Sequence, residues 1–519
     1  MRINIDKHNK KSSILDKFLN FIEKGGNKLP HPVTLFAILA FIVVIFSAIL
    51  SAMGTSVEIP QANGITGAVE QITVTAKSLL SKEGVRFIFE NAITNFTHFD
   101  PVGVVLVTML CIAVAEGTGL INACLRKFML NIPKNAVTIA VIFMGIMSNI
   151  ASDSGYVVVV PLGALIYLSM GRHPFAGIAA AFFGVSGGFS ANLLLGSIDP
   201  LLAGFSTVGA RVLQTDYYVS PVANYYFMFI STILITIVGT IVNNKIVEPR
   251  LGKYNGLEKA SLESLTENEN KGLKYALIAL IITIIGILFL VLPKDAILRN
   301  PDTGQILGNS PFMNSIVIVV GILFFFPGLF YGIGSKSIKN DKELIDIVSS
   351  IMGTMGGYLV LTFVASQFVA YFKYSNLGLI MAVNGAEVLN AINLSGISLL
   401  VVFVFITAFM NLFIGSAVTK WSIMAPVFIP MFMMLGLSPE STQLAFRIGD
   451  SSTNIISPLM PFFSIVLSIS QKYDKKAGIG TLISIMMPYS ILLIIIWTIF
   501  MIIWLTIGLP IGPGANLFL

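Results

Sequence analysis

Charged residues are scarce in this chain of 519 residues: Asp, Glu, Lys and Arg make up 11%, against about a quarter in soluble proteins. Hydrophobic residues make up 55%, which is more apolar surface than one soluble globule of this length can bury. The few charges are bunched in residues 1–32, 54–98 and 248–274, so long stretches are almost uncharged. This composition excludes a soluble enzyme and a nucleic-acid-binding protein, and it indicates an integral membrane protein.

Cysteine and histidine are also rare. The two cysteines, Cys111 and Cys124, are too few for a disulfide framework or a four-ligand metal site. No two of the four histidines have the spacing of metal ligands. We therefore expect no structural metal and no cofactor. The first long apolar run begins only after about thirty polar or amphipathic residues, so we expect no cleavable signal peptide of the usual design.

Long apolar runs predict the spans. A helix that crosses about 30 Å of hydrocarbon needs about 20 residues. Nine regions meet this requirement: 33–53, 99–120, 174–208, 222–247, 273–293, 314–335, 350–372, 439–470 and 478–508. Before them, apolar residues at helical spacing between Ile14 and Ile22 predict a short interfacial helix. The fold class is therefore an all-α membrane protein with about nine transmembrane helices.

Two further apolar regions, 135–171 and 395–437, are each interrupted by a polar cluster. Irregular backbone at membrane depth survives only where protein or a wet cavity covers it. We interpret both regions as re-entrant helical hairpins with polar tips. The first cluster is Ser148, Asn149, Ser152, Asp153 and Ser154, and the second is Asn411, Gly415, Ser416, Thr419 and Lys420.

The distribution of Lys and Arg predicts the orientation, because cytoplasmic loops are rich in both. With the N-terminus in the cytoplasm, most basic residues between predicted spans fall on the cytoplasmic side. This assignment requires the first hairpin to enter from the cytoplasm and the second from outside. The C-terminus is then expected outside.

The opposite orientation of the hairpins suggests an inverted repeat. Adding 265 to positions in the first hairpin region pairs six residues without a gap: Tyr156 with Trp421, Pro161 with Pro426, Gly171 with Gly436, Pro174 with Pro439, Gly184 with Gly449 and Ser186 with Ser451. Matched Gly and Pro predict matched breaks in the helices that follow the hairpins. Paired broken helices are a usual place for substrate and ion sites in secondary transporters.

The repeat gives the chain four predicted parts. A cytoplasmic segment, 1–32, contains the interfacial helix. The first half, 33–247, contains hairpin 135–171 and broken helix 174–208. A cytoplasmic linker covers 248–272, and the second half, 273–519, contains hairpin 395–437 and broken helix 439–470.

Buried charges mark the candidate site, because a charge near the bilayer centre requires a partner or a function. Arg447 and Asp450 lie three residues apart, on one face if the helix persists. One interpretation is a mutual ion pair. The other, which we favour, is that the planar guanidinium binds a substrate carboxylate. Asp199, in Asp199-Pro200, is either part of the site or a turn residue.

Hydroxyl and amide groups follow Asp450 and also occupy the first hairpin tip. They are oxygen donors of the kind that hard cations bind, although helix capping uses the same residue types. The candidate ion-binding residues are Ser148, Asn149, Asp153, Ser154, Asp450, Ser451, Ser452 and Asn454. Asp153 could instead close a turn. The coupling ion is therefore sodium or a proton.

Trp421 follows Lys420 at the second hairpin tip. A tryptophan at this depth either stacks on a planar substrate or packs in the protein interior. The sequence leaves these alternatives open.

Four separated stretches resemble the aminobenzoyl-glutamate transporter (AbgT) family. They are Ser-Asp-Ser-Gly-Tyr-Val-Val-Val-Val-Pro at 152–161, Leu-Gly-Ser-Ile-Asp-Pro at 195–200, Lys-Trp-Ser-Ile-Met-Ala-Pro at 420–426 and Phe-Arg-Ile-Gly-Asp-Ser at 446–451. The resemblance runs from about residue 30 to the C-terminus. It implies a homodimer in the bacterial inner membrane, with nine transmembrane helices and two hairpins in each subunit.

The resemblance also implies substrate-side residues at Asp199, Trp421, Pro439, Arg447, Asp450 and Pro458, with a hairpin-tip asparagine at Asn411. The implied substrate is p-aminobenzoyl-glutamate, whose flat ring suits Trp421 and whose two carboxylates suit Arg447 and Lys420. The implied alternative is export of p-aminobenzoic acid and sulfonamide-like antimetabolites.

The leading hypothesis is a cation-coupled secondary transporter of an aromatic carboxylate, with no catalytic residues. An anion channel is a more distant alternative, for which we expect rings of repeated charge that this sequence lacks. An intramembrane hydrolase is disfavoured, because Gly449-Asp450 has no second catalytic motif and no serine accompanies a membrane histidine.

Overall fold

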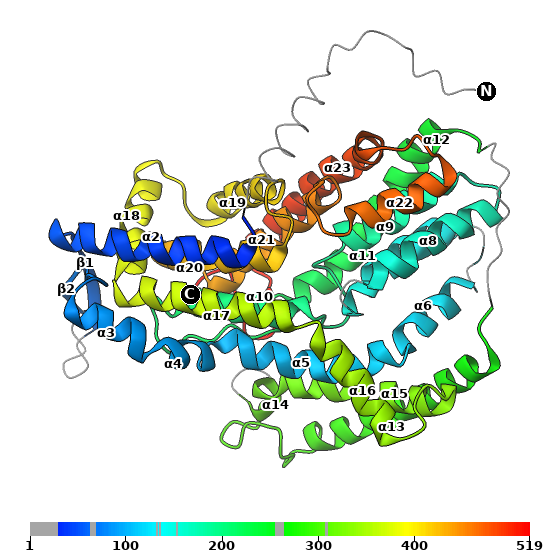
Figure 1. The fold of residues 1–519 in the computed structure, drawn as a ribbon, viewed down its shortest axis with the longest axis horizontal. Helices are drawn as coiled ribbons and strands as arrows, with labels where there is room; N and C mark the ends of the chain where they lie inside the picture. Colours follow the sequence, from blue (N-terminus) through cyan, green and yellow to red (C-terminus); the bar gives the residue numbers. More distant parts are fainter. Residues whose placement is uncertain are drawn as a thin grey trace, which may run out of the picture.

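The structure is a computed structural model, and it describes residues 30–62, 69–130, 133, 136–151, 154–254, 264–306 and 310–519. The predicted interfacial helix at Ile14–Ile22 and most of the predicted linker lie outside these residues. Nearly all described elements are helices, and Figure 1 shows them as one elongated assembly.

All nine predicted spans contain helix. Five helices are by themselves long and apolar enough to cross a membrane: α2 (Pro32–Ala52), α11 (Tyr225–Val242) with its continuation to Leu251, α13 (Glu267–Val291), α15 (Ile316–Ser335) and α23 (Ile479–Thr506). Up to eight spans result among the described residues if three bent helix pairs each count as one. The pairs are α5 (Asp100–Gly117) with α6 (Leu120–Leu130), α16 (Asp341–Gly353) with α17 (Gly356–Tyr374), and α18 (Leu377–Ala391) with α19 (Gly396–Asn411). The total of nine stays a prediction.

Both predicted hairpin regions consist of two helices joined at the expected polar cluster. In the first, α7 (Val137–Ser148) is followed by a short 3-10 turn and then by α8 (Ser154–Ser169). In the second, α19 ends at Asn411 and α20 (Ala417–Met433) begins after a non-helical tip. Ser416 caps α20 by accepting a hydrogen bond from the Thr419 amide.

Both predicted broken helices are interrupted where glycine or polar residues accumulate. The first consists of α9 (Pro174–Phe182), a π-helical turn over Phe183–Gly187, an irregular segment and α10 (Ile198–Ala210). The second consists of α21 (Pro439–Asn454), an irregular segment and α22 (Phe463–Tyr473).

Several elements were not predicted. A β-hairpin pairs β1 (Ser56–Ala62) with β2 (Val69–Thr75) in antiparallel register, Ser56 opposite Thr75. The amphipathic helices α6 and α16 extend two spans at an angle. Short helices complete the described chain: α3 (Lys82–Glu90), α4 (Ala92–Thr97), α12 (Glu248–Leu251) and α14 (Pro311–Asn314).

Two groups of helices in Figure 1 position the site. One group contains α5, α13 and α15, which pack side by side along one edge. Apolar side chains on α13, including Ile282 and Phe289, are exposed, as expected for a surface that faces lipid. The other group contains both hairpins, both broken helices, α11 and α23. We call these groups the scaffold and the core.

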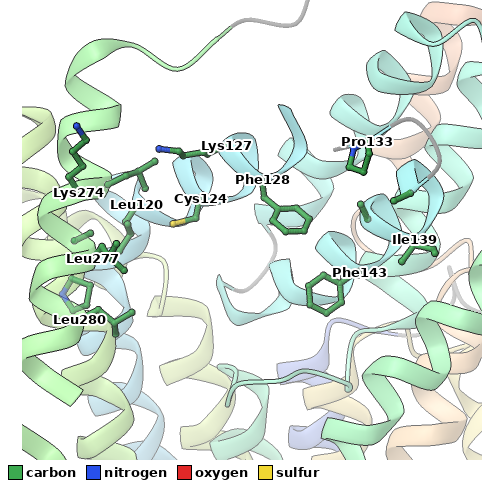
Figure 2. Close-up of a pocket in the computed structure, with 15 residues that line it drawn as sticks. Leu120, Cys124, Lys127, Phe128, Pro133, Ile139, Phe143, Lys274, Leu277 and Leu280 are labelled. Carbon is green, nitrogen blue, oxygen red and sulfur yellow. The ribbon is translucent and has the colours of Figure 1, made fainter. Parts of the chain in front are cut away.

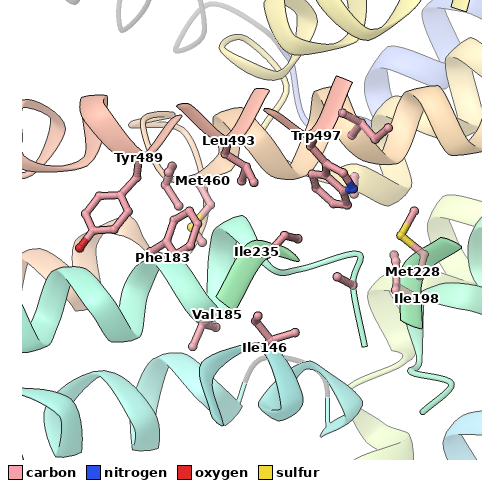
Figure 3. Close-up of a cluster of buried hydrophobic side chains, with 14 of the residues drawn as sticks. Ile146, Phe183, Val185, Ile198, Met228, Ile235, Met460, Tyr489, Leu493 and Trp497 are labelled. Carbon is pink, nitrogen blue, oxygen red and sulfur yellow. The ribbon is translucent and has the colours of Figure 1, made fainter. Parts of the chain in front are cut away.

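The core is held together by one large cluster of buried apolar side chains. Figure 3 shows Phe183 of the first broken helix beside Tyr489 of α23, and Val185 of the same helix pointing towards Ile146 of α7. The Phe183 and Tyr489 rings stack with centroids 4.7 Å apart. The Trp497 indole N–H donates a 2.8 Å hydrogen bond to the Ser231 hydroxyl of α11. The ring contact joins the broken helix to α23, and the hydrogen bond joins α23 to α11.

Candidate functional site

Each broken helix packs closely on the first helix of its hairpin, and a glycine permits this approach. A Cβ atom at Gly184 would lie 2.4 Å from the Ile142 carbonyl oxygen of α7. A Cβ atom at Gly449 would lie 2.3 Å from the Val404 carbonyl oxygen of α19. Both distances are too short for any side chain, so glycine is required at both positions.

Two buried ion pairs lie beside the second break. The Lys420 ammonium is 2.5 Å from Asp450 Oδ1, and both side chains are fully buried. Arg447 Nη1 is 2.6 Å from Asp199 Oδ1, with 1% and 12% of the two side chains exposed. The first pair joins hairpin helix α20 to α21, and the second joins the two broken helices. With all four groups ionised, the cluster has no net charge.

Arg447 and Asp450 do not pair with each other, so the mutual ion pair considered from the sequence is wrong. They share one face of α21, but each has a partner from another element. Asp199 does more than close a turn: its Oδ2 accepts a 2.7 Å hydrogen bond from the Gly196 amide three residues earlier, and its Oδ1 pairs with Arg447.

The guanidinium of Arg447 has one occupied edge and one open edge. Nη1 contacts Asp199 and donates to the Ser190 carbonyl oxygen at 3.4 Å. Nε and Nη2 are buried and have no hydrogen-bond partner among the described residues. A buried donor without a partner is costly. Together these two N–H groups form a planar fork that matches the two oxygens of a carboxylate.

Asn411 fastens the second hairpin tip to the end of α21. Its side-chain amide donates to the Asp450 carbonyl oxygen at 2.8 Å, to Thr453 Oγ1 at 2.9 Å and to Asn454 Oδ1 at 2.8 Å. Its Oδ1 accepts a hydrogen bond from the Lys420 ammonium. The hairpin tip and the break are therefore one hydrogen-bonded unit.

Asn149 makes a similar contact at the first hairpin tip. Its side-chain amide donates to the Val185 carbonyl oxygen at 2.9 Å and to the Gly188 carbonyl oxygen at 3.4 Å. Val185 and Asp450, whose carbonyl oxygens accept from the two tip asparagines, are 265 residues apart, which is the offset of the sequence repeat. Asn149 Oδ1 is buried without a hydrogen-bond partner among the described residues.

The candidate ion-binding residues of the second break lie together. Ser451 Oγ accepts a 3.3 Å hydrogen bond from the Ser190 amide, so the two breaks meet here. Ser452 Oγ is buried and has no hydrogen-bond partner in the described part of the chain. The Asn454 amide donates to Asp450 Oδ2 at 3.3 Å.

The candidate ion-binding residues at the first tip are only partly described. Ser148 Oγ donates to the Gly145 carbonyl oxygen at 2.6 Å, an ordinary interaction within a helix. Asp153 lies outside the described residues. Ser154 begins α8, but its side chain is not among those described.

Trp421 is packed in the protein interior in this structure. It is fully buried, and its indole N–H donates to the Leu202 carbonyl oxygen at 3.1 Å and to Ser206 Oγ at 3.0 Å. Its ring lies against Phe446 with centroids 4.4 Å apart. Of the two alternatives left by the sequence, this conformation shows packing.

The two prolines of the predicted site occupy different places. Pro439 is the first residue of α21, eleven residues before Asp450, which is about 16 Å along a helix axis. Pro439 therefore does not join the two ion pairs. Pro458 lies in the irregular segment after α21, next to Ser457, whose hydroxyl donates to the Asn411 carbonyl oxygen at 3.0 Å.

Sequence reasoning missed a chain of polar side chains that extends from the Trp421 contact. Ser206 Oγ donates to Gln443 at 2.6 Å, and Gln443 donates to Asn224 at 2.8 Å. Tyr217 OH donates to Glu440 Oε2 at 2.9 Å. Helix α21 carries polar residues at helical spacing: Glu440, Gln443, Arg447 and Asp450. This polar stripe within an apolar span was the sequence pattern that could have predicted the chain of polar side chains.

A cavity of about 200 Å³ lies beside this site. It is lined by Tyr156 of α8, by Ser416 and Ala417 at the second hairpin tip, and by Asn454 and Phe462 at the second break. A larger cavity, about 830 Å³, lies elsewhere. Figure 2 shows it between α6, α7 and α13, with Cys124, Phe143 and Leu277 on its walls. That cavity is mainly apolar and none of the four paired charges lines it, so we place the site at the ion pairs.

Comparison with known proteins gives consistent results across the chain. A family model described as the AbgT putative transporter family matches residues 17–519. The p-aminobenzoyl-glutamate transport protein of Escherichia coli (strain K12) is 38% identical over 503 residues, which are 97% of each chain.

Two solved structures are similar to this one. The Alcanivorax borkumensis YdaH transporter matches with a TM-score of 0.87 and 43% identity, over 93% of this chain and 100% of that chain. Neisseria gonorrhoeae MtrF, described as illuminating a class of antimetabolite efflux pumps, matches with a TM-score of 0.90 and 45% identity, over 96% of this chain and 100% of that one.

Proposed function

This chain belongs to the AbgT putative transporter family, and we propose that it is a cation-coupled secondary transporter of p-aminobenzoyl-glutamate or a related aromatic carboxylate. The proposed location is the bacterial inner membrane, with the N-terminus in the cytoplasm and the C-terminus outside. The proposed assembly is a homodimer. The E. coli relative named as a p-aminobenzoyl-glutamate transport protein supports the choice of substrate.

The observation that carries the proposal is the open edge of Arg447. Nε and Nη2 are buried without a partner among the described residues, while Nη1 is held by Asp199. A substrate carboxylate would accept two parallel hydrogen bonds from that edge and would satisfy both donors. Because Asp199 belongs to the other broken helix, a carboxylate that competes with it for Arg447 would loosen the contact between the two halves. This competition would couple substrate binding to movement of the two broken helices relative to each other.

The proposed substrate-side residues lie on α10, α20 and α21, at the second hairpin tip and in the segment that follows α21. They are Asp199, Asn411, Lys420, Trp421, Pro439, Arg447, Asp450 and Pro458. Trp421 would reach an aromatic ring only after leaving its contact with Phe446, so a stacking role requires a second conformation. The inverted repeat is supported by the paired glycine contacts at Gly184 and Gly449.

The proposed coupling ion is sodium or a proton. Buried oxygens without hydrogen-bond partners among the described residues, on Asn149 and Ser452, favour a cation ligand set. The proposed ion-side residues remain Ser148, Asn149, Asp153, Ser154, Asp450, Ser451, Ser452 and Asn454.

Transport by the purified protein in proteoliposomes tests the proposal. We expect concentrative movement of labelled p-aminobenzoyl-glutamate under an imposed sodium or pH gradient, and its loss in Arg447→Ala and Asp450→Asn. Arg126→Gln is the matched control, because it removes an arginine from a 2.9 Å ion pair with Glu269 outside the core. Full activity in both site variants would contradict the assigned site.

The second candidate function is export of p-aminobenzoic acid and sulfonamide-type antimetabolites. The similarity to MtrF, which is described with antimetabolite efflux pumps, favours it. A single carboxylate or an ionised sulfonamide would use the same fork on Arg447. Loading of sulfonamide into inside-out proteoliposomes, competed by p-aminobenzoyl-glutamate, would support export through the same site.

A further inference from the structure

The Lys420 ammonium lies in a cage of oxygen atoms. Asp450 Oδ1 is 2.5 Å from Nζ, Asn411 Oδ1 accepts a hydrogen bond from it, and the Ile414 carbonyl oxygen is 3.5 Å away. The side chain is fully buried. One carboxylate, one amide oxygen and one backbone carbonyl form the kind of ligand set that proteins use for a hard cation. Three acceptors also match the three N–H donors of an ammonium.

We propose that the Lys420 ammonium occupies the cation site at the second hairpin tip, so that sodium does not bind there in this chain. This inference rests on the proposed function as a cation-coupled transporter. A lysine is tethered and cannot leave the site as sodium does.

The elements packed on α20 bring few other charges near Lys420. Asp450, Arg447 and Glu440 lie on α21, and Asp199 lies on α10. Helix α19 has no titratable residue, and Glu387 of α18 is exposed. His31 precedes α2 and, with Thr419, lines a cavity beside the hairpin tip. Lys373 and three tyrosines lie on α17. Among these groups, Asp450 is the one in direct contact with the ammonium.

Thermal unfolding of the purified protein tests the cage without any transport. Melting temperatures are compared in sodium chloride and in choline chloride for the wild type, Lys420→Gln and the control Arg126→Gln. We expect sodium to raise the melting temperature of Lys420→Gln specifically, because this variant keeps the oxygens and lacks the tethered cation. The wild type and the control should show no sodium-specific rise. A rise of equal size in the wild type, or none in Lys420→Gln, would overturn the proposal.

Transport of p-aminobenzoyl-glutamate in proteoliposomes tests the coupling. We expect the wild type to transport in sodium-free buffer and Lys420→Gln to respond to an imposed sodium gradient. A strict sodium requirement of the wild type, or no sodium response of Lys420→Gln, would overturn the proposal. If no protein moves the substrate, the proposed function fails, while the melting experiment still decides the role of Lys420.

Discussion

The close contact at Gly449 makes a strong prediction about how the second hairpin is held. In Gly449→Ala the new methyl group would lie 2.3 Å from the Val404 carbonyl oxygen and 2.8 Å from Thr407 Cβ, whereas ordinary contacts are 3.4–4 Å. Helix α19 must therefore move away from α21 by about an ångström, since backbone cannot rotate aside as a side chain does. Overpacking of this kind costs about 1–3 kcal/mol. The displacement should also weaken the Asn411 contacts that fasten the hairpin tip.

Gly286→Ala is the matched control for this prediction. Gly286 also lies within a helix, α13, but a Cβ atom there would meet nothing within 4 Å. Alanine in a helix interior is more favourable than glycine by about 0.5–1 kcal/mol, so the control should be neutral or slightly stabilised. Thermal unfolding of both purified variants in the same detergent is the assay. A Gly449→Ala protein as stable as Gly286→Ala, with full transport activity, would refute the close-packing account of the hairpin.

Three further predictions follow from named contacts. Asp450→Leu should destabilise the protein by about 3–5 kcal/mol, because it leaves the Lys420 ammonium buried without its carboxylate. The double variant Lys420→Met with Asp450→Leu should recover part of this loss. Equal unfolding temperatures for the single and double variants would contradict the prediction. Trp421→Phe should lower the free energy of unfolding by about 1 kcal/mol or more, because the indole hydrogen bonds are lost. Its unfolding temperature should fall, whereas that of the control Trp504→Phe, whose hydrogen bond is exposed, should change little. Burial lowers the pKa of His173 below its usual 6.5, against an opposing effect of Glu248. The contribution of neutral His173 to stability should therefore be complete above pH 6.5 and should be lost as the pH falls below 6.5. His173→Asn should remove this part of the pH dependence of unfolding.

The sequence predicted the interruptions of the helices well, because polar and glycine-rich clusters seldom occur within an apolar run unless the helix is interrupted there. The interruption near Gly184 and the one after Asp450 both occur where they were expected. The matched glycines carried structural information that composition alone could not supply, since each allows backbone contact with a hairpin helix. The β-hairpin β1–β2 was missed because residues 54–98 were treated only as a charged segment between apolar runs.

The sequence could identify the charged residues of the site but not their pairing. Arg447 and Asp450 are three residues apart, and local spacing favoured contact between them. Their observed partners are Asp199, on the other broken helix, and Lys420, on the second hairpin. Such pairing depends on how distant elements pack, and a buried charge takes the partner that packing brings closest. The same limit applies to Trp421, whose contacts with Leu202 and Ser206 come from the first half of the chain.

Equilibrium binding of labelled p-aminobenzoyl-glutamate to the purified protein tests the central claim most directly, namely that the open edge of Arg447 receives a substrate carboxylate. Arg447→Lys keeps the positive charge near Asp199 but removes the planar fork. Hydrogen bonds to charged groups contribute about 1.5–3 kcal/mol each, so losing one or both should raise Kd by about tenfold or more. The control Arg126→Lys should bind like the wild type. An unchanged Kd in Arg447→Lys would contradict the account.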